Sequence, residues 1–243
     1  MSTFLELCQR ARREVGIPGT GPSTVAGQVG DLGKLVVDVA EAWNEIQESR
    51  PNWRWMRGEW TLQTVAAQGA YTVTEAGIVA RHRWWDRMNT KLFLTADGVA
   101  GEAPIPWISY STWERIYNTG SQVDDQPVSW SIRPEDDAIV LGPAPDAVYT
   151  VSGWYWKNQQ KLTVDADTPE CPADYHITII WLTVMMNKQF TEAAAQFDFA
   201  VEWYGRWLAR LELNQLVRTE IGMNPIGDHG LDEAETAQIF EID

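Results

Sequence analysis

The hydrophobic period of the chain changes twice along its length, and this change constrains the fold most strongly. Apolar side chains recur at helical spacing in residues 5–15. Apolar and polar side chains then alternate in the middle of the chain, as in residues 128–132, which is the pattern of half-buried strands. Helical spacing returns in residues 175–186 and 195–211. We therefore predict an α+β fold in which helices at the two ends flank a β-rich middle.

Local signals place the ends of the first two helices. Thr3 and Glu6 form a capping box, and Gly16 ends the first helix. A glycine-rich connector follows. Asp31 is expected to cap the second helix, which Pro51 stops.

Alternation and turn residues predict the strands of the middle region, together with one short helix. Ser111 and Glu114 form a second capping box, which is expected to open that helix. The expected strands are a hairpin of residues 60–65 with 71–73, two strands at 78–86 and 91–95, a hairpin of 128–132 with 138–141, and a long strand at 148–156.

Packing of the terminal helices would give a four-helix bundle, with the β-rich region inserted between its second and third helices. We expect a helical bundle of residues 1–57 and 169–216 and a β-rich insertion domain of residues 58–168. Residues 217–243 are expected to form an extended C-terminal tail. From Thr219 onward this tail contains seven acidic residues and no lysine or arginine, so it lacks the composition for a core of its own.

The composition excludes several classes of protein. The formal net charge is −15 and the pI is about 4.6, so the chain repels phosphates and is a poor general binder of nucleic acids. Cys8 and Cys171 are too few for a disulfide framework and fit a reducing compartment. No stretch approaches the roughly 20 apolar residues of a membrane span, and we see no secretion signal. Fourteen residues are tryptophan, which indicates many interfaces or a ligand platform.

No motif for catalysis or for a cofactor stands out. Residues 27–35 only superficially resemble a phosphate-binding loop, because the first glycine is misplaced and Leu35 replaces the serine or threonine that would hold magnesium. The acidic clusters at residues 124–125, 135–137 and 165–167 fall in predicted turns, which favours solvated turns over catalytic carboxylates. No nucleophile elbow is present. We therefore predict a protein that is not an enzyme and needs no cofactor.

The three histidines give no strong metal signal. None of His82, His176 and His229 has a cysteine or histidine partner at metal-ligand spacing. His176 is expected at the surface or as a helix cap. His229, beside Asp228 and Asp232, leaves a weak cation site open, although a solvated tail is favoured.

Arginine and tryptophan interleave in two places. One patch lies in residues 50–57 and the other in residues 81–91. Such residues stack on bases and pair with phosphates, but they also form cation–π pairs and anchor protein interfaces. The acidic character of the chain favours the protein interface. Contacts between copies or with a partner are expected at Arg54, Trp55, Arg57, Arg83, Trp84 and Trp85.

Three stretches, taken in order, match the pattern of a known family. They are the opening helix pair ending in Trp43-x-x-Ile46-Gln47 and Trp53-x-Trp55-Met56-Arg57, the predicted hairpin at residues 62–73, and residues 141–151 followed by Pro169-x-x-Pro172-x-x-Tyr175-His176. Over about residues 1–215 the chain resembles the head–tail adaptor, or connector, proteins of tailed bacteriophages, including the gatekeeper or tail tubular protein A type.

The resemblance implies a structural function without catalysis. It implies a ring of about twelve copies beneath the portal protein, with the C-terminal segment docked into the portal and the opposite face receiving the next tail component. Double-stranded DNA would pass through the lumen without specific binding. Such a protein is a virion component at the head–tail interface, assembled in the host cytoplasm. The expected portal anchors are the apolar tail residues Ile221, Met223, Ile226, Leu231, Ile239, Phe240 and Ile242.

Two other functions stay open on the sequence alone. A tryptophan-rich carbohydrate-binding or glycosidase-like protein would stack exposed indoles on sugar rings. A nucleic-acid-binding protein would use the two arginine–tryptophan patches, and its binding would weaken as salt rises.

Overall fold

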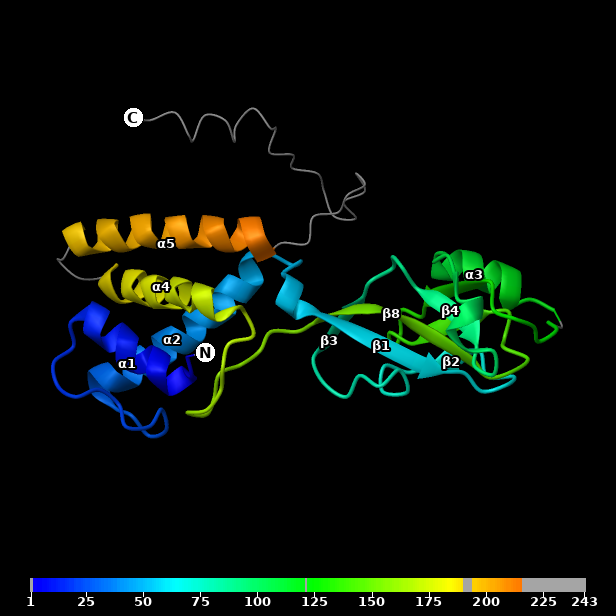
Figure 1. Cartoon of the computed structure of the whole chain (residues 1–243), viewed down its shortest axis with the longest axis horizontal. Helices are drawn as coiled ribbons and strands as arrows, with labels where there is room; N and C mark the ends of the chain where they lie inside the picture. The colour runs from blue at the N-terminus through cyan, green and yellow to red at the C-terminus, as the bar shows by residue number, and fades with distance from the viewer. Residues whose placement is uncertain (1, 121, 190–193, 216–243) are drawn as a thin grey trace, which may run out of the picture.

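Helices and strands lie in two separate lobes, side by side along the long axis of the molecule (Figure 1). The computed structural model describes residues 2–120, 122–189 and 194–215. We call the part built from α1, α2, α4 and α5 the helical lobe and the part built from the strands and α3 the β lobe. The helices are α1 (Phe4–Val15), α2 (Gly30–Ser49), α3 (Tyr110–Tyr117), α4 (His176–Lys188) and α5 (Ala194–Gln215), with short 3-10 turns η1 (Arg54–Met56), η2 (Gly98–Gly101) and η3 (Ala173–Tyr175).

The first helix forms as its sequence predicts. The Thr3 side chain accepts from the Glu6 backbone N–H, and the Glu6 carboxylate accepts from the Thr3 N–H, which confirms the capping box. Gly16 ends the helix at φ +83°, a conformation that glycine adopts without a steric penalty. The second helix differs from expectation. It begins at Gly30 behind Val29, with no side-chain cap, and Asp31 lies inside its first turn, where its charge favours the helix dipole.

Helix α4 is the centre of the helical lobe. It contacts α1, α2 and α5, and α1 also packs on α2. The α4 sequence is apolar around most of its circumference, which fits burial on several sides at once. Helix α5 packs chiefly on α4, so much of its remaining surface faces solvent. The four-helix bundle stays a prediction.

Two antiparallel sheets enclose the core of the β lobe. The larger has the order β1-β8-β4-β5, and β3 pairs with the C-terminal half of β8. The smaller has the order β2-β7-β6. Their buried residues form one cluster, which includes Trp60, Trp85 and Trp130. The strands are β1 (Arg57–Gln63), β2 (Ala70–Tyr71), β3 (His82–Trp85), β4 (Lys91–Leu94), β5 (Ala103–Pro104), β6 (Ser129–Ile132), β7 (Ile139–Gly142) and β8 (Tyr149–Lys157).

One predicted hairpin is confirmed and the other is wrong. Strands β6 and β7 pair as expected around the turn at residues 133–137. Strands β1 and β2 do not pair, because β1 pairs with β8 and β2 with β7. The Tyr71 hydroxyl contacts the backbone of Val65 and Gln68 and closes a compact loop between them. That loop carries the chain from one sheet to the other.

The N-cap of the short helix α3 lies two residues earlier than predicted. Ser109, not Ser111, is the N-cap, and its hydroxyl accepts from the Thr112 backbone N–H. Helix α3 packs beside β6 at the end of the β lobe that is far from the helical lobe (Figure 1). None of the helices in the described part of the chain has the length and hydropathy to cross a bilayer.

Candidate interaction surfaces

Half of the fourteen tryptophans belong to the protein's own two cores. Trp43, Trp53, Trp55 and Trp156 are buried in the helical core, and Trp60, Trp85 and Trp130 are buried in the β core. The other seven are half-buried. The expectation that these indoles serve partners or a ligand platform is therefore wrong for half of them, and no row of fully exposed rings is present for stacking sugars.

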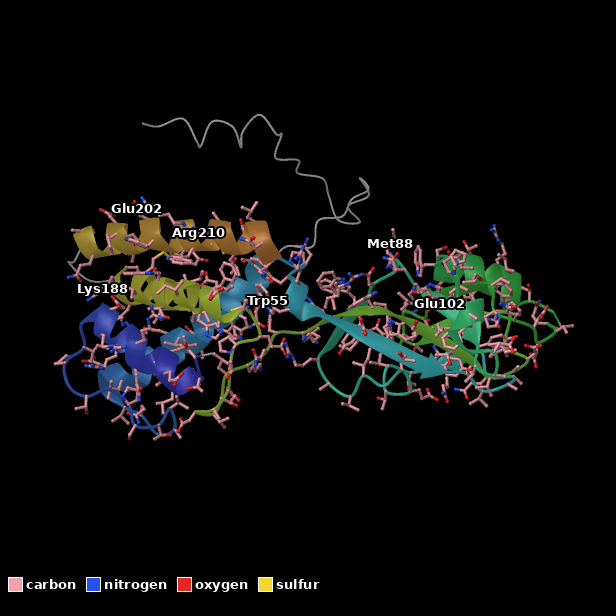
Figure 2. All side chains as sticks on the ribbon, in the orientation of Figure 1. Trp55, Met88, Glu102, Lys188, Glu202 and Arg210 are labelled. Atoms are coloured by element: carbon pink, nitrogen blue, oxygen red, sulfur yellow. The ribbon has the colours of Figure 1, made fainter. Side chains whose placement is uncertain are left out.

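The first arginine–tryptophan patch forms the joint between the two lobes. Trp53 and Trp55 stack with ring centroids 4.6 Å apart, and Trp55 also stacks on Trp43 of α2. The Trp53 indole N–H donates to the Ile46 carbonyl at 2.8 Å. Trp55 is only 9% exposed, which corrects its prediction as a partner contact, whereas Arg54 is exposed. Figure 2 shows Trp55 between the lobes.

Residues of the second patch also make most of their contacts within the chain. Trp85 is 3% exposed and its indole N–H donates to the Asp137 carbonyl, so it too is corrected from a contact candidate to a core residue. Arg57, from the first patch, forms an ion pair with Asp86 at 2.7 Å and lies over the ring of Trp154. Arg83 lies over Trp84 at 4.2 Å, and both are half-buried. Of the six candidates, only Arg54 is exposed, and the other five are buried or half-buried.

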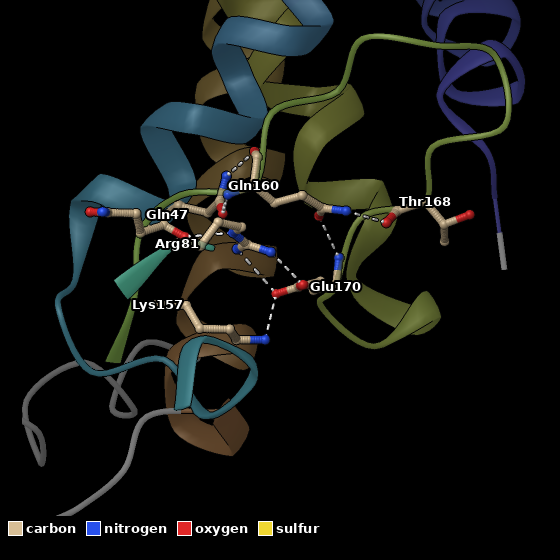
Figure 3. Close-up of polar contacts among 7 residues, drawn as sticks. Gln47, Arg81, Lys157, Gln160, Thr168 and Glu170 are labelled. Carbon is tan, nitrogen blue, oxygen red and sulfur yellow. Dashed lines mark hydrogen bonds and ion pairs between the residues drawn. The ribbon is translucent and has the colours of Figure 1, made fainter. Parts of the chain in front are cut away.

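A network of hydrogen bonds and ion pairs joins the segment that follows β8 to the helical lobe (Figure 3). The Gln47 side chain of α2 is fully buried; its amide N–H₂ donates to the Gln160 carbonyl, and its oxygen accepts from the Gln160 N–H at 2.7 Å. The Gln160 side chain donates to the Thr168 carbonyl and accepts from the Glu170 N–H. Glu170 in turn binds Arg81 at 2.6 Å and Lys157 at 2.9 Å. The network therefore joins residues from both lobes.

Acid is expected to weaken this network. Burial raises the pKa of Glu170, but hydrogen bonds from Arg81 and Lys157 outweigh it and hold the pKa below its ordinary value of 4.5. A carboxyl with a lowered folded-state pKa stabilises the fold above its unfolded-state pKa, and this contribution disappears as pH falls through the folded-state pKa. Glu170→Gln should therefore reduce stability at pH 7 and lose that effect toward pH 3.

Chemical denaturation of the wild type and Glu170→Gln between pH 7 and pH 3 measures this convergence. Glu135→Gln, on an exposed turn, is the matched control and should follow the wild-type curve throughout. A Glu170→Gln deficit that stays constant down to pH 3 would contradict the role given to the ionised carboxylate.

One charged surface escaped the sequence-based prediction. Trp203 and Trp207 lie in the segment predicted to be the last helix, and both are half-buried on α5, with Arg206 and Arg210 lying over their rings. Phe199 is 49% exposed beside them. The signal was present in the sequence as two arginines spaced four residues apart, each three residues after a tryptophan.

The chain matches the model of the SU10 adaptor protein family over residues 2–226. It belongs to the SU10 adaptor protein family. The match covers both lobes and identifies the chain as a phage structural adaptor, which is the coarser part of the resemblance seen in the sequence. No curated protein matches the chain.

In this SU10 adaptor family member, several acidic and thiol side chains make structural contacts or are buried. Within the described residues, no three histidine, cysteine, aspartate or glutamate side chains gather as a metal site would require. Asp165 accepts from Thr24 and the Val25 N–H, and Asp136 pairs with Arg133, so both stabilise turns. Burial raises the pKa of the Cys171 thiol to about 12, which makes it a poor nucleophile.

His176 is a buried structural residue, which corrects its prediction as a surface or capping residue. Its Nδ1 accepts from the Ser2 N–H at 3.3 Å, and its Nε2 lies 3.3 Å from the Cys171 carbonyl oxygen. Burial lowers its pKa, so the ring is neutral at pH 7 and links the start of α1 to the start of α4. The predicted portal anchors Ile221, Met223, Ile226, Leu231, Ile239, Phe240 and Ile242, and the open cation site at His229, lie outside the described residues.

Proposed function

We propose that the protein is a head–tail adaptor that forms a ring beneath the portal protein, extends the DNA channel and presents a docking surface to the next tail component. The family match over both lobes carries this proposal. The gatekeeper or tail tubular protein A type, the ring of about twelve copies, the bundle and domain boundaries, and the location in the virion belong to the same proposal.

The charge of the chain supports passage of DNA through such a ring. Each copy has a formal net charge of −15. A ring of such copies would present a negative lumen, which repels the phosphate backbone instead of exchanging counterions with it. Double-stranded DNA would then move through the channel without adhering to its wall.

The joint between the lobes supports a role as a stiff spacer. Stacked Trp43, Trp53 and Trp55 fill its apolar side, and Gln47 and Glu170 hold its polar side. A connector between a portal and a tail must keep the distance between its two partners constant. A joint filled by packed rings and paired charges resists bending better than a glycine-rich linker would.

Removal of the acidic tail is expected to abolish portal docking and leave the two lobes folded. A chain ending at residue 216 keeps both cores and the joint between them. Co-sedimentation with the cognate portal protein measures docking, and far-UV circular dichroism measures folding. The control keeps the full length and replaces Ile239, Phe240 and Ile242 with serine, which should weaken docking through the same apolar anchors. Normal portal binding by the truncated chain would contradict the docking role of the tail.

The whole proposal is tested by electron microscopy of the protein mixed with its cognate portal. A ring of adaptor copies on one end of the portal is the expected result. A chain that never associates with the portal at any concentration would overturn the proposed function.

A further inference from the structure

Helix α5 presents a basic and aromatic flank to solvent, which we define as Phe199, Trp203, Arg206 and Arg210. Trp181 of α4 stacks on Trp203 with ring centroids 5.9 Å apart, so one side of the Trp203 ring packs against α4. Arg206 and Arg210 lie 5.6 Å and 5.2 Å from the centroids of Trp203 and Trp207. Aromatic and arginine side chains together are the composition of protein interface hot spots.

The basic flank is not neutralised within the chain. The Arg206 side chain is 64% exposed and, within residues 2–120, 122–189 and 194–215, forms an ion pair only with Glu202, one turn earlier on the same helix. Such exposed pairs contribute little. Arg210 has no ion-pair partner among the described residues. Figure 2 shows Glu202 and Arg210 on the outer side of the helical lobe.

The neighbouring helix α2 presents an acidic flank, which we define as Glu41 and Glu45. Both carboxylates are exposed, and within the described part of the chain neither has an ion-pair partner. The C-terminal end of α2 lies beside α5, because Arg50 at its C-cap pairs with Glu212 of α5 at 2.9 Å. Glu45 belongs to the last turns of α2, at the end of the helix that borders the side of α5 carrying Glu212.

The basic flank and Glu212 lie on opposite sides of α5. At 100° per residue, positions 199, 203, 206 and 210 gather on one side of the helix, whereas positions 201, 205, 208 and 212 gather on the other. The contact between Arg50 at the end of α2 and Glu212 lies on the second side. Among the described residues of one copy, no ion pair joins the basic flank to the acidic flank.

We propose that the basic flank of one copy packs against the acidic flank of the next copy and forms the contact between neighbours in the ring. The proposal rests on the proposed function and names the surfaces that would carry its self-association. A contact between two different surfaces of the same chain is heterologous, or head-to-tail, and such contacts generate rings when the rotation between neighbours closes. The exposed Phe199 ring and the half-buried Trp203 ring would supply the apolar centre of the contact.

Charge reversal tests this pairing on the full-length protein. Variant A carries Arg206→Glu and Arg210→Glu, and variant B carries Glu41→Arg and Glu45→Arg. Each variant alone would bring like charges together at every contact, so we expect its ring fraction on the cognate portal to fall at least about tenfold. Negative-stain microscopy and analytical ultracentrifugation count the rings, and circular dichroism checks that each variant folds.

The rescue experiments make the test specific. A chain that carries all four substitutions restores opposite charges at each contact and should form rings again. A mixture of A and B should also assemble, because copies that alternate around the ring place opposite charges at every contact. Recovery in both samples supports the pairing. Wild-type rings together with normal rings from A or B alone would overturn it.

Cysteine cross-linking provides a second readout that does not depend on charge-reversed variants. The chain's own Cys8 and Cys171 are buried, so cysteines introduced by Arg210→Cys and Glu45→Cys would be the accessible thiols. We expect a bismaleimide to produce a ladder of covalent oligomers on the portal, and neither single variant should give one. Wild-type rings without that ladder would overturn the pairing, whereas failure of the wild type itself to form rings on the portal would overturn the proposed function and the pairing with it.

Discussion

Replacing Trp53 with alanine is expected to remove about 3–5 kcal/mol from the free energy of unfolding. Trp53 is fully buried, stacks on Trp55 at 4.6 Å and donates its indole N–H to the Ile46 carbonyl. The substitution would open a cavity at the joint and remove one of two hydrogen bonds that the Ile46 carbonyl accepts, the other coming from the Ser49 hydroxyl. Because whole proteins of this kind are stable by only about 5–15 kcal/mol, a large fraction of the stability would be lost.

Urea denaturation followed by far-UV circular dichroism measures this loss. Trp53→Phe keeps an aromatic ring but no indole N–H, and its loss should lie between those of the wild type and Trp53→Ala. Trp113→Ala is the matched control, since Trp113 is a half-buried indole on α3 and should lose less than half as much. Equal losses for the two alanine variants would show that Trp53 has no special role in the joint.

Replacing Gln47 with leucine is expected to cost about 2–4 kcal/mol, although leucine has nearly the same size and is more apolar. The Gln47 amide satisfies both the N–H and the carbonyl of Gln160, and a buried backbone group without a partner loses its hydration without compensation. The hydrophobic gain from leucine is smaller than this double loss.

Thermal and urea unfolding measure the effect, with Gln159→Ala as the control. Gln159 makes an exposed hydrogen bond to Glu48 in the same segment, and its removal should change stability by less than about 0.5 kcal/mol. If Gln47→Leu proves neutral or stabilising, water must replace the two hydrogen bonds between Gln47 and the Gln160 backbone. The network would then not stabilise the contact between the lobes.

Local patterns predicted the elements better than they predicted the pairing between them. The Thr3–Glu6 box and the β6–β7 hairpin depend on residues close in sequence, and both are present. The partner of β1 is β8, more than eighty residues away, and no turn signal records such a pairing. The sequence-based prediction therefore paired β1 with the segment around Tyr71, which is close in sequence, and this pairing is wrong.

The sequence also did not predict which aromatic and polar side chains are buried. Tryptophan has an apolar body and a polar N–H, so its presence in a sequence does not separate a core residue such as Trp85 from a surface residue. His176 is buried where the Ser2 N–H, from the far end of the sequence, meets its ring beside the nearby Cys171 carbonyl, and only the first of these contacts is remote in sequence. The basic flank was not predicted, because the spacing of Trp203 also fits a buried helix face. Helix α5 packs chiefly on α4, and this packing leaves the basic flank exposed.

The pairing of β1 with β8 has a mechanical consequence. Both strands enter the joint at the same end, where Arg57 lies opposite Trp156, and they run antiparallel from there. A force that separates the lobes would therefore pull both strands in the same direction and would not open the pair from that end. It would load the hydrogen bonds that join β8 to β3 and β4 along the strand direction, as in shear. Those bonds would resist such a force together. The stacked indoles and the Glu170 ion pairs lie at the end where the strands meet the helical lobe, so they would resist bending at the joint.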